Sequence, residues 1–560
     1  MKLIHIFIEL HKSVKSLNIS LSGPAKCIFT DGYVGIEFRK DTSNYYLNHH
    51  CSAIIGANGV GKSSVLDFVE SSYYMTDSSG LLIFFDESDD SFHICPINMA
   101  ISGCSMDATI HDGFEEFAHR HKIILIKINN VSDAQGRLGY EKKFRHPLIQ
   151  NRSLEEYTRL KPKRKRYFDN LLRYFKWNAE KDNLIDNVGF EFNFHNSTEK
   201  LDRFLQESDL QFEYIEKYNQ SLDYFSTVRR HYSNSFTREP RHNLSEHLSF
   251  LNIFPLIMDL SSEVKGSLRK YVSSFLQYYF LISVFSKKDT MIRCLRGAVE
   301  ALRYSENWDV FKSQDIKSIL LEEDVDVSSI HEKLNFSEKV LTDIAHQLEN
   351  NSGLPNEDNG ISFLVDDFHT VSEVIGLSNT LSRNTLSNIS WGWRGISTGE
   401  MARSHLLSET FDSLRRSKTG NLIIVIDEVD LYLHPEWQRS FLDSYLTLLN
   451  KIEGVMTRPQ ILITTHSPII ISDFLPQDIV SLVKDDDGEL HLRDSLGFGT
   501  NITSLFIDGM HVESTFGEHS RKAIVSLMKK AKEGTLSESD RTLIGEMGNT
   551  YVRDFLLKND

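Results

Sequence analysis

The clearest chemical signal in the sequence is a glycine-rich loop followed by lysine and serine, which fits the pattern G-x-x-x-x-G-K-S. Its members are Gly56, Ala57, Asn58, Gly59, Val60, Gly61, Lys62, Ser63 and Ser64. Glycines in such a loop let backbone N–H groups point at phosphate oxygens, Lys62 would reach the β- and γ-phosphates, and Ser63 would bind Mg²⁺. An apolar run precedes the loop and a helical pattern follows it. This stretch therefore predicts a site for ATP or another nucleoside triphosphate with Mg²⁺.

Three polar segments in the second half of the chain follow the loop in a suggestive order. Ser397-Thr398-Gly399-Glu400 precedes a helical pattern, Asp427-Glu428 ends a fully apolar strand, and His466 ends another. Each segment also has an ordinary explanation when taken singly. The first could be a helix N-cap, the second a polar end of a strand, and the third a histidine packed in the core. Phosphoryl transfer needs a cation, a backbone cradle and a carboxylate beside the attacking water. The order of the four segments favours that chemistry.

In this order the segments resemble the ATP-binding-cassette (ABC) ATPases of the SMC and RecF kind. Within them, the chain is similar to compact bacterial defence ATPases, which include the overcoming-lysogenization-defect (OLD) proteins and the PtuA-type subunits of Septu and retron systems. The resemblance covers about 1–130 and 361–560, and the middle only by position. It implies an α/β fold, namely an ABC-type P-loop NTPase head with a large, mainly helical insertion between the P-loop and the signature motif.

The resemblance also implies a role for each matching residue. Asp427 resembles the Walker B aspartate that holds Mg²⁺ through water, Glu428 the general base that polarises the attacking water, and His466 the switch histidine that senses the γ-phosphate. Ser397, Gly399 and Glu400 resemble the signature motif, which meets the nucleotide bound by the opposite protomer of a dimer. Asp430 resembles the dimer-contacting D-loop residue. Thr398 departs from the usual Gly or Ser, and the Q-loop glutamine has two undistinguished candidates, Gln135 and Gln150.

Changes of residue character along the chain predict four parts. Residues 1–150 form the N-terminal lobe with the P-loop, and residues 151–360 a glycine-poor helical insertion. Residues 361–500 form the C-terminal lobe with the signature, Walker B and switch histidine, and residues 501–560 a helical tail. The apolar stretch 271–285 is interrupted by polar residues and too short to cross a membrane, so we expect a buried aromatic helix there.

Composition narrows the class of protein. The formal net charge of the 560-residue chain is −16, which argues against a protein that coats nucleic acid over its whole surface. Five scattered cysteines suit a reducing compartment and predict no zinc site. The N-terminus reads as a strand without a signal-peptide cleavage site. We therefore expect a cytoplasmic protein without membrane contact.

The expected function is that of an ATP-binding and ATP-hydrolysing regulatory subunit of an antiphage defence complex. The resemblance implies a homodimer or higher oligomer, a partner HNH nuclease of the PtuB type, and in some systems a retron reverse transcriptase with its DNA–RNA hybrid. Two basic, aromatic segments, Lys161–Lys176 and Arg229–His242, are candidates for nucleic-acid contact, although a solvated basic helix face with its aromatic side chains in the core explains them slightly better. Alternatives are a DNA-repair or OLD-like ATPase that acts directly on nucleic acid, and a transporter ATPase. No nuclease motif is recognised, so we expect the chain alone to cleave neither DNA nor RNA.

Overall fold

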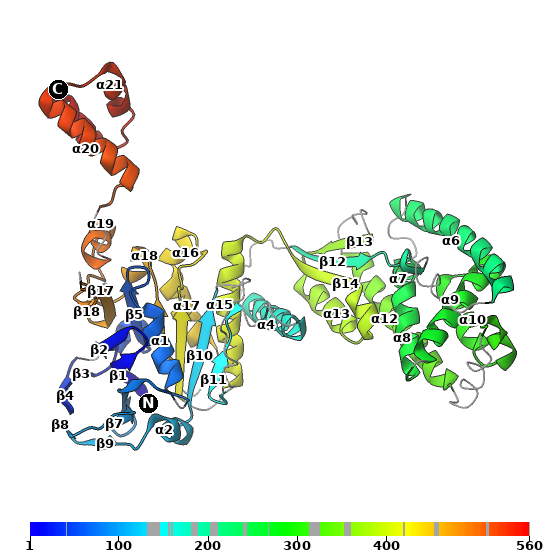
Figure 1. Cartoon of the computed structure of the whole chain (residues 1–560), viewed down its shortest axis with the longest axis horizontal. Helices are drawn as coiled ribbons and strands as arrows, with labels where there is room; N and C mark the ends of the chain where they lie inside the picture. The colour runs from blue at the N-terminus through cyan, green and yellow to red at the C-terminus, as the bar shows by residue number, and fades with distance from the viewer. Residues whose placement is uncertain are drawn as a thin grey trace. The chain divides into compact units, whose positions relative to one another are not determined.

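The chain divides into two compact units in a computed structural model (Figure 1). The first unit comprises Met1–Tyr174 and Thr398–Asp560, and the second Phe175–Ser397. The structure describes residues 1–40, 42–74, 76–130, 146–154, 157, 161–180, 189–201, 211–238, 244–266, 268–312, 325–351, 360–417, 421–452, 458–485, 487–510 and 514–558.

A seven-stranded sheet forms the centre of the first unit. In spatial order its strands are β11 (Ile149–Asn151), β10 (Ile123–Asn129), β15 (Asn421–Asp427), β16 (Gln460–Thr464), β5 (His50–Gly56), β17 (Ile479–Lys484) and β18 (Leu490–Arg493). The strands from β11 to β17 run parallel, and β18 returns antiparallel to β17. The inner strands are nearly continuous apolar runs because both faces of a parallel sheet are buried. Parallel pairing brings the ends of β5, β10, β15 and β16 to one edge.

Two smaller sheets in the first unit are built from the N-terminal segment. The first contains β2 (Val14–Ser20), β1 (Lys2–His11), β6 (Ser79–Asp86), β7 (Ser91–Ile97) and β9 (Ala108–Ile110); the second contains β3 (Ala25–Thr30), β4 (Tyr33–Phe38) and β8 (Gly103–Cys104). One face of β1 and β6 packs with the central sheet around buried Ile54, Phe68 and Leu462. The other face packs with β3 and β4 around Phe7 and Phe29. This packing supports the strand that enters the glycine-rich loop.

Short helices join the strands of the first unit. They are η1 (Ser43–Tyr46), α1 (Lys62–Ser71), α2 (Phe114–Arg120), α15 (Thr398–Arg416), α16 (Pro435–Arg439), α17 (Phe441–Lys451), α18 (Pro468–Ile471) and η5 (Pro476–Asp478). The C-terminal region adds α19 (Ile502–Ser504), the π-helical turn η6 (Leu505–Gly509), α20 (Glu518–Glu533), α21 (Glu538–Gly545) and α22 (Thr550–Lys558). The last three helices share a small apolar core that includes Leu527, Ile544 and Leu556.

The second unit combines helices with a small sheet. Its helices are α6 (Phe212–Arg238), α7 (Leu244–Leu251), α8 (Ile253–Leu260), η3 (Ser261–Glu263), α9 (Leu268–Lys287), α10 (Met291–Ala301), η4 (Ser305–Val310), α12 (Val327–Asn351), α13 (Phe368–Ser378) and α14 (Arg383–Ser387). Helix α4 (Lys161–Glu180) begins in the first unit and ends in the second. The buried aromatic helix expected near 271–285 is α9, in which Phe275 and Phe280 are fully buried. Among the described residues, we find no helix with the length and apolarity needed to cross a membrane.

The small sheet determines where the second unit ends. Strand β12 (Gly189–His195) lies between β13 (Gly360–Val365) and β14 (Ile389–Arg394), and both pairings are antiparallel. Residues 361–397, which the sequence analysis assigned to the C-terminal lobe, therefore belong to the second unit. The physical reason is that β13 and β14 satisfy their backbone hydrogen bonds beside β12, which lies far away in the sequence.

Candidate functional site

The glycine-rich loop connects β5 to α1 through a backbone that requires glycine. Gly56 has φ +147°, and a β-carbon there would lie 2.4 Å from the carbonyl oxygen of Leu482 on the neighbouring strand. Gly61 has φ +117° and immediately precedes α1, whose N-terminus receives no side-chain cap among the described residues. The first-turn N–H groups of a helix are orphan donors that favour an anion. The loop thus has the form of a phosphate cradle.

Lys62 is buried at the base of this loop. Its Nζ donates hydrogen bonds to the carbonyl oxygens of Gly56 (3.0 Å) and Ala57 (3.2 Å). Burial lowers the pKa of Lys62, while the carboxylates of Glu428 and Asp427 act in the opposite direction. The lysine is therefore held at the loop by backbone oxygens, beside a group of acidic side chains.

Ser63 joins the loop to the end of β15. Its Oγ donates to Oδ2 of Asp427 at 3.2 Å and lies 3.3 Å from Oδ1. A hydroxyl beside a carboxylate offers the oxygen ligands that Mg²⁺ prefers. The structure thus brings together the two residues that the sequence predicted to hold the metal.

Glu428 follows Asp427 in an unusual backbone conformation. Its φ is +51°, a left-handed value that costs a residue other than glycine about 1–3 kcal/mol. Its N–H donates to Oγ1 of Thr464 at 2.7 Å, and the same hydroxyl donates to Oδ1 of Asp427 at 2.6 Å. The hydroxyl of Thr464, at the end of β16, therefore holds the turn that follows β15.

The segment after β16 carries His466 and is tied to Asp430. Oδ1 of Asp430 accepts hydrogen bonds from the Thr465 hydroxyl (2.5 Å) and from the backbone N–H of His466 (3.0 Å). Burial lowers the pKa of His466, and the charge of Lys62 acts in the same direction. The imidazole thus lies within the electrostatic reach of the phosphate loop.

The signature segment lies at the start of α15. Ser397 and Thr398 are exposed, whereas Gly399 is buried. A β-carbon on Gly399 would lie 2.7 Å from the carbonyl oxygen of Tyr432 and 2.8 Å from the Trp437 ring. Close packing of α15 on the segment after β15 thus requires this glycine. An encounter of Ser397, Gly399 and Glu400 with the nucleotide of a second protomer stays a prediction.

The end of β10 contributes two polar residues that the sequence analysis missed. Asn129 pairs with Asp427 in the register of the sheet. Asn130 is buried, and its Oδ1 has no hydrogen-bond partner among the described residues. Of the two glutamine candidates, Gln150 bonds with Ser417 and Arg152, and Gln135 lies outside the described residues. The sequence feature that could have identified these two residues is an apolar strand that ends in Asn-Asn.

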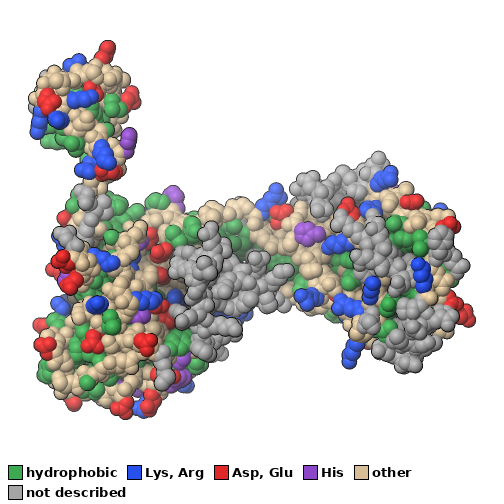
Figure 2. All heavy atoms as spheres, in the orientation of Figure 1, with side chains coloured by type: hydrophobic (Ala, Val, Ile, Leu, Met, Phe, Trp, Pro, Cys, Tyr) green, Lys and Arg blue, Asp and Glu red, His purple; other side chains and the backbone are tan. Residues whose placement is uncertain are grey.

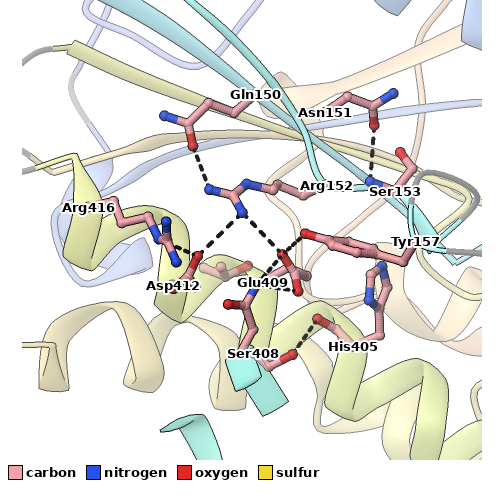
Figure 3. A network of polar contacts seen from close by, with 12 residues as sticks. Gln150, Asn151, Arg152, Ser153, Tyr157, His405, Ser408, Glu409, Asp412 and Arg416 are labelled. Carbon is pink, nitrogen blue, oxygen red and sulfur yellow. Dashed lines mark hydrogen bonds and ion pairs between the residues drawn. The ribbon is translucent and has the colours of Figure 1, made fainter. Parts of the chain in front are cut away.

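Helix α15 is anchored by a buried network of charged side chains (Figure 3). Arg152 lies 3.7 Å from Glu409 and 3.3 Å from Asp412, and all three side chains are almost fully buried. Tyr157 donates to Glu409 at 2.6 Å, and Asn170 of α4 donates to it at 2.9 Å. Burial raises the pKa of the Glu409 carboxyl, while these two donors act to lower it.

Arg173 on α4 and Arg416 on α15 complete this network at Asp412, at 3.1 Å and 2.7 Å. The sequence motifs did not reveal these contacts, because the partners come from three separate segments. The network joins the helix that begins with the signature to the middle of α4.

Several aromatic side chains of the two basic, aromatic segments pack against other parts of the protein. In Lys161–Lys176, Tyr167, Tyr174 and Phe175 are buried. In Arg229–His242, Tyr232 stacks on Phe250 with ring centroids 4.5 Å apart. Tyr167, Tyr174 and Phe175 therefore pack inside the protein, whereas Tyr232 is partly buried, and contact of the two segments with nucleic acid stays a prediction. On the face of the first unit shown in Figure 2, basic and acidic side chains are interspersed. The side chains of 161–165, 168 and 233–238, and residues 239–243, lie outside what the structure describes.

Comparison with known families defines the class of protein. The family described as the AAA ATPase domain matches residues 1–471 of the chain. The chain therefore belongs to the AAA ATPase domain family. This finding confirms that the chain is an ATPase, as the glycine-rich loop and the apolar strands predicted.

Two relatives match shorter parts of the chain. The Septu protein PtuA of Bacillus thuringiensis is 30% identical over 116 residues, which are 20% of this chain and 28% of that protein. The Retron Vc95 probable ATPase of Vibrio cholerae serotype O1 biovar El Tor is 34% identical over 67 residues, 12% of each chain. The matches therefore span less than a third of the length of either relative. They agree with the expected resemblance to Septu and retron ATPases.

Proposed function

We propose that this chain binds and hydrolyses ATP as the regulatory subunit of an antiphage defence complex, and that its nucleotide state controls a partner HNH nuclease. The observation that carries the ATPase part is the meeting of the phosphate loop with the ends of β15 and β16. The defence role is supported by the similarity to a Septu protein and to a retron ATPase. The proposal further includes an ABC-type head in which 151–360 is an insertion, and a cytoplasmic location.

The residues present suit ATP with Mg²⁺. The loop from Gly56 to Gly61 would surround the phosphates, and Lys62 would exchange its two backbone acceptors for phosphate oxygens. Ser63 and Asp427 would hold Mg²⁺, which supplies charge neutralisation at the phosphates when bound. Glu428, next to the metal ligand, would accept a proton from the attacking water, and His466 would contact the γ-phosphate. At the same sheet edge, Asn130 offers a buried amide oxygen that has no hydrogen-bond partner in the described part of the chain.

A dimer with shared sites would couple hydrolysis to the partner nuclease. Ser397, Gly399 and Glu400 of one protomer would complete the site of the other, so the dimer would form with ATP and open after hydrolysis. A change of the bound nucleotide can alter partner binding only if the partner has different affinities for the two conformations of the dimer. The nuclease would therefore bind the ATP-bound and ADP-bound forms with different affinity.

The Glu428→Gln substitution tests the switch. The variant should bind ATP with wild-type affinity, lose hydrolysis and accumulate as an ATP-bound dimer on a sizing column, because the amide cannot accept the proton. Glu37→Gln, at an exposed position of β4, is the matched control and should behave as wild type. Equal hydrolysis by Glu428→Gln and wild type would refute the base assignment.

The C-terminal helices are the proposed docking element for the nuclease. Tyr551 is 84% exposed and Phe555 46% exposed, and their spacing puts them on one face of α22. Leu543 on α21 is also exposed. Co-purification with an HNH protein encoded next to this gene should be lost in Tyr551→Ser/Phe555→Ser or after deletion from Leu543 onward. Retention by both variants would exclude the tail.

Nuclease activity is assigned to the partner. The chain alone should cleave neither DNA nor RNA with Mg²⁺ or Mn²⁺. The acidic turn between β17 and β18 provides the check, because Asp485, Glu489 and His491 hold their ligand atoms within 4.8 Å of one another. Metal-dependent cleavage that Asp485→Asn abolishes would favour an OLD-like enzyme acting directly on nucleic acid.

A further inference from the structure

Thr464 occupies the last position of β16, between the strand that ends in Asp427 and the strand that enters the phosphate loop. Its side chain is fully buried. Oγ1 donates a hydrogen bond to Oδ1 of Asp427 at 2.6 Å and accepts one from the N–H of Glu428 at 2.7 Å. A hydroxyl can donate one bond while it accepts another, so a single side-chain atom contacts both acidic residues at once.

The first contact orients the carboxylate of Asp427. Oδ1 is bound to Thr464, and the Ser63 hydroxyl lies 3.2 Å from Oδ2 and 3.3 Å from Oδ1. A hydrogen bond that occupies one oxygen of a metal-binding carboxylate fixes its rotation and leaves the other oxygen for the metal.

The second contact fixes the backbone of Glu428. The backbone oxygen of Thr464 also accepts the N–H of Val429 at 3.0 Å, so two successive N–H groups are held by one residue. The left-handed φ of +51° at Glu428 is unfavourable and persists only where surrounding contacts impose it. Because φ sets the direction of the Cα–Cβ bond, these contacts fix the direction in which the Glu428 side chain leaves the backbone.

We infer that Thr464 is a positioning residue that orients both the metal-binding carboxylate of Asp427 and the proton-accepting carboxylate of Glu428. The inference rests on the proposed ATPase mechanism for the roles of those two acids. Thr464 is not one of the phosphate-loop residues, the strand-end acids or the histidine to which the proposed mechanism assigns a role. Loss of an outer contact to a metal ligand typically reduces metal affinity or activity by about 10–100-fold.

The test compares Thr464→Val, which keeps the shape and removes the hydroxyl, with Thr464→Ser, which keeps the hydroxyl. Thr464→Val should lower kcat and raise the Mg²⁺ concentration for half-maximal ATP binding by about 10–100-fold. Binding of a fluorescent ATP analogue without Mg²⁺ should be unchanged. Thr464→Ser should restore both properties to within a few-fold of wild type. Thr410→Val, another buried threonine with a hydroxyl partner, controls for the effect of burying valine.

A second measurement does not depend on turnover. In the nucleotide-free protein, the amide of Glu428 should exchange with deuterium faster in Thr464→Val than in wild type or Thr410→Val. If Thr464→Val does not fold, Thr464→Ala and Thr464→Ser provide the same comparison.

Two outcomes would overturn the inference. One is an unchanged Mg²⁺ dependence and unchanged Glu428 exchange in Thr464→Val. The other is equal impairment in Thr464→Ser and Thr464→Val, which would assign the effect to packing. Failure of the wild type to hydrolyse ATP would instead refute the proposed function, while amide exchange would still decide the role of Thr464.

Discussion

The hydroxyl of Ser63 lies 3.2 Å from Oδ2 of Asp427, although 364 residues separate them in the sequence. Ser63 lies in the first turn of α1, the helix after β5, and Asp427 ends β15, with β16 between the two strands. Parallel strands end at the same edge of a sheet, so this arrangement brings a hydroxyl and a carboxylate from distant segments into one oxygen site.

The Lys62→Ala substitution should abolish ATP binding. The variant removes the cation that would offset the β- and γ-phosphates, and the carboxylates beside it would then repel the nucleotide. Equilibrium binding of a fluorescent ATP analogue measures the effect, with exposed Lys26→Ala on β3 as the control. ATP affinity within twofold of wild type would contradict the assignment.

Ser397→Arg should stop turnover, because the larger side chain would fill the nucleotide site of the opposite protomer. Mixing this variant with Lys62→Ala tests whether the two protomers share their sites. Lys62→Ala and Ser397→Arg are each expected to be inactive. A mixed dimer contains one site with wild-type Lys62 and wild-type Ser397, so part of the activity should return. Ser520→Arg, on an exposed face of α20, is the control. No recovery after mixing, or a wild-type rate from a monomer, would contradict a shared site.

Arg152→Met should destabilise the first unit. The variant leaves Glu409 and Asp412 without their buried cation, and breaking a buried ion pair from one side costs about 3–5 kcal/mol. Denaturant unfolding measures the change. Arg439→Met breaks a solvent-exposed pair with Glu436 and should have little effect. Equal midpoints for the two variants would show that the network does not stabilise the fold.

The stability of the protein should fall as the pH decreases from about 6.5 to about 4. Burial lowers the pKa of His5 from 6.5 to about 4, so the unfolded chain binds the proton more readily than the folded chain. The contribution of a neutral His5 is present above pH 6.5, and its loss across this window amounts to about 3 kcal/mol.

Melting curves measured across this range test the contribution of His5. His5→Gln should show a smaller loss of melting temperature than wild type, and the exposed control His519→Gln should match wild type. Parallel curves for His5→Gln and wild type would assign the acid sensitivity to other groups, such as buried His405.

Features that depend on neighbouring residues can be recognised in the sequence. The glycine-rich loop is recognisable because its glycines, lysine and serine are consecutive, and their backbone conformations are local requirements. The strands that end in Asp427 and Thr464 are recognisable because a strand buried on both faces is a continuous apolar run. Such local features were enough to predict the ATPase class that the family match confirms.

Tertiary structure alone decided which distant groups touch. The bonds of Thr464 to Asp427 and Glu428, and those of Arg152 to Glu409 and Asp412, join segments whose separation carries no periodic signal. The extent of the second unit likewise depends on β13 and β14 pairing with β12. Backbone and buried polar groups must find partners, but any of several distant segments could supply them. Only the packed chain selects the partner, which is why motifs located the acids and the fold revealed the threonine that orients them.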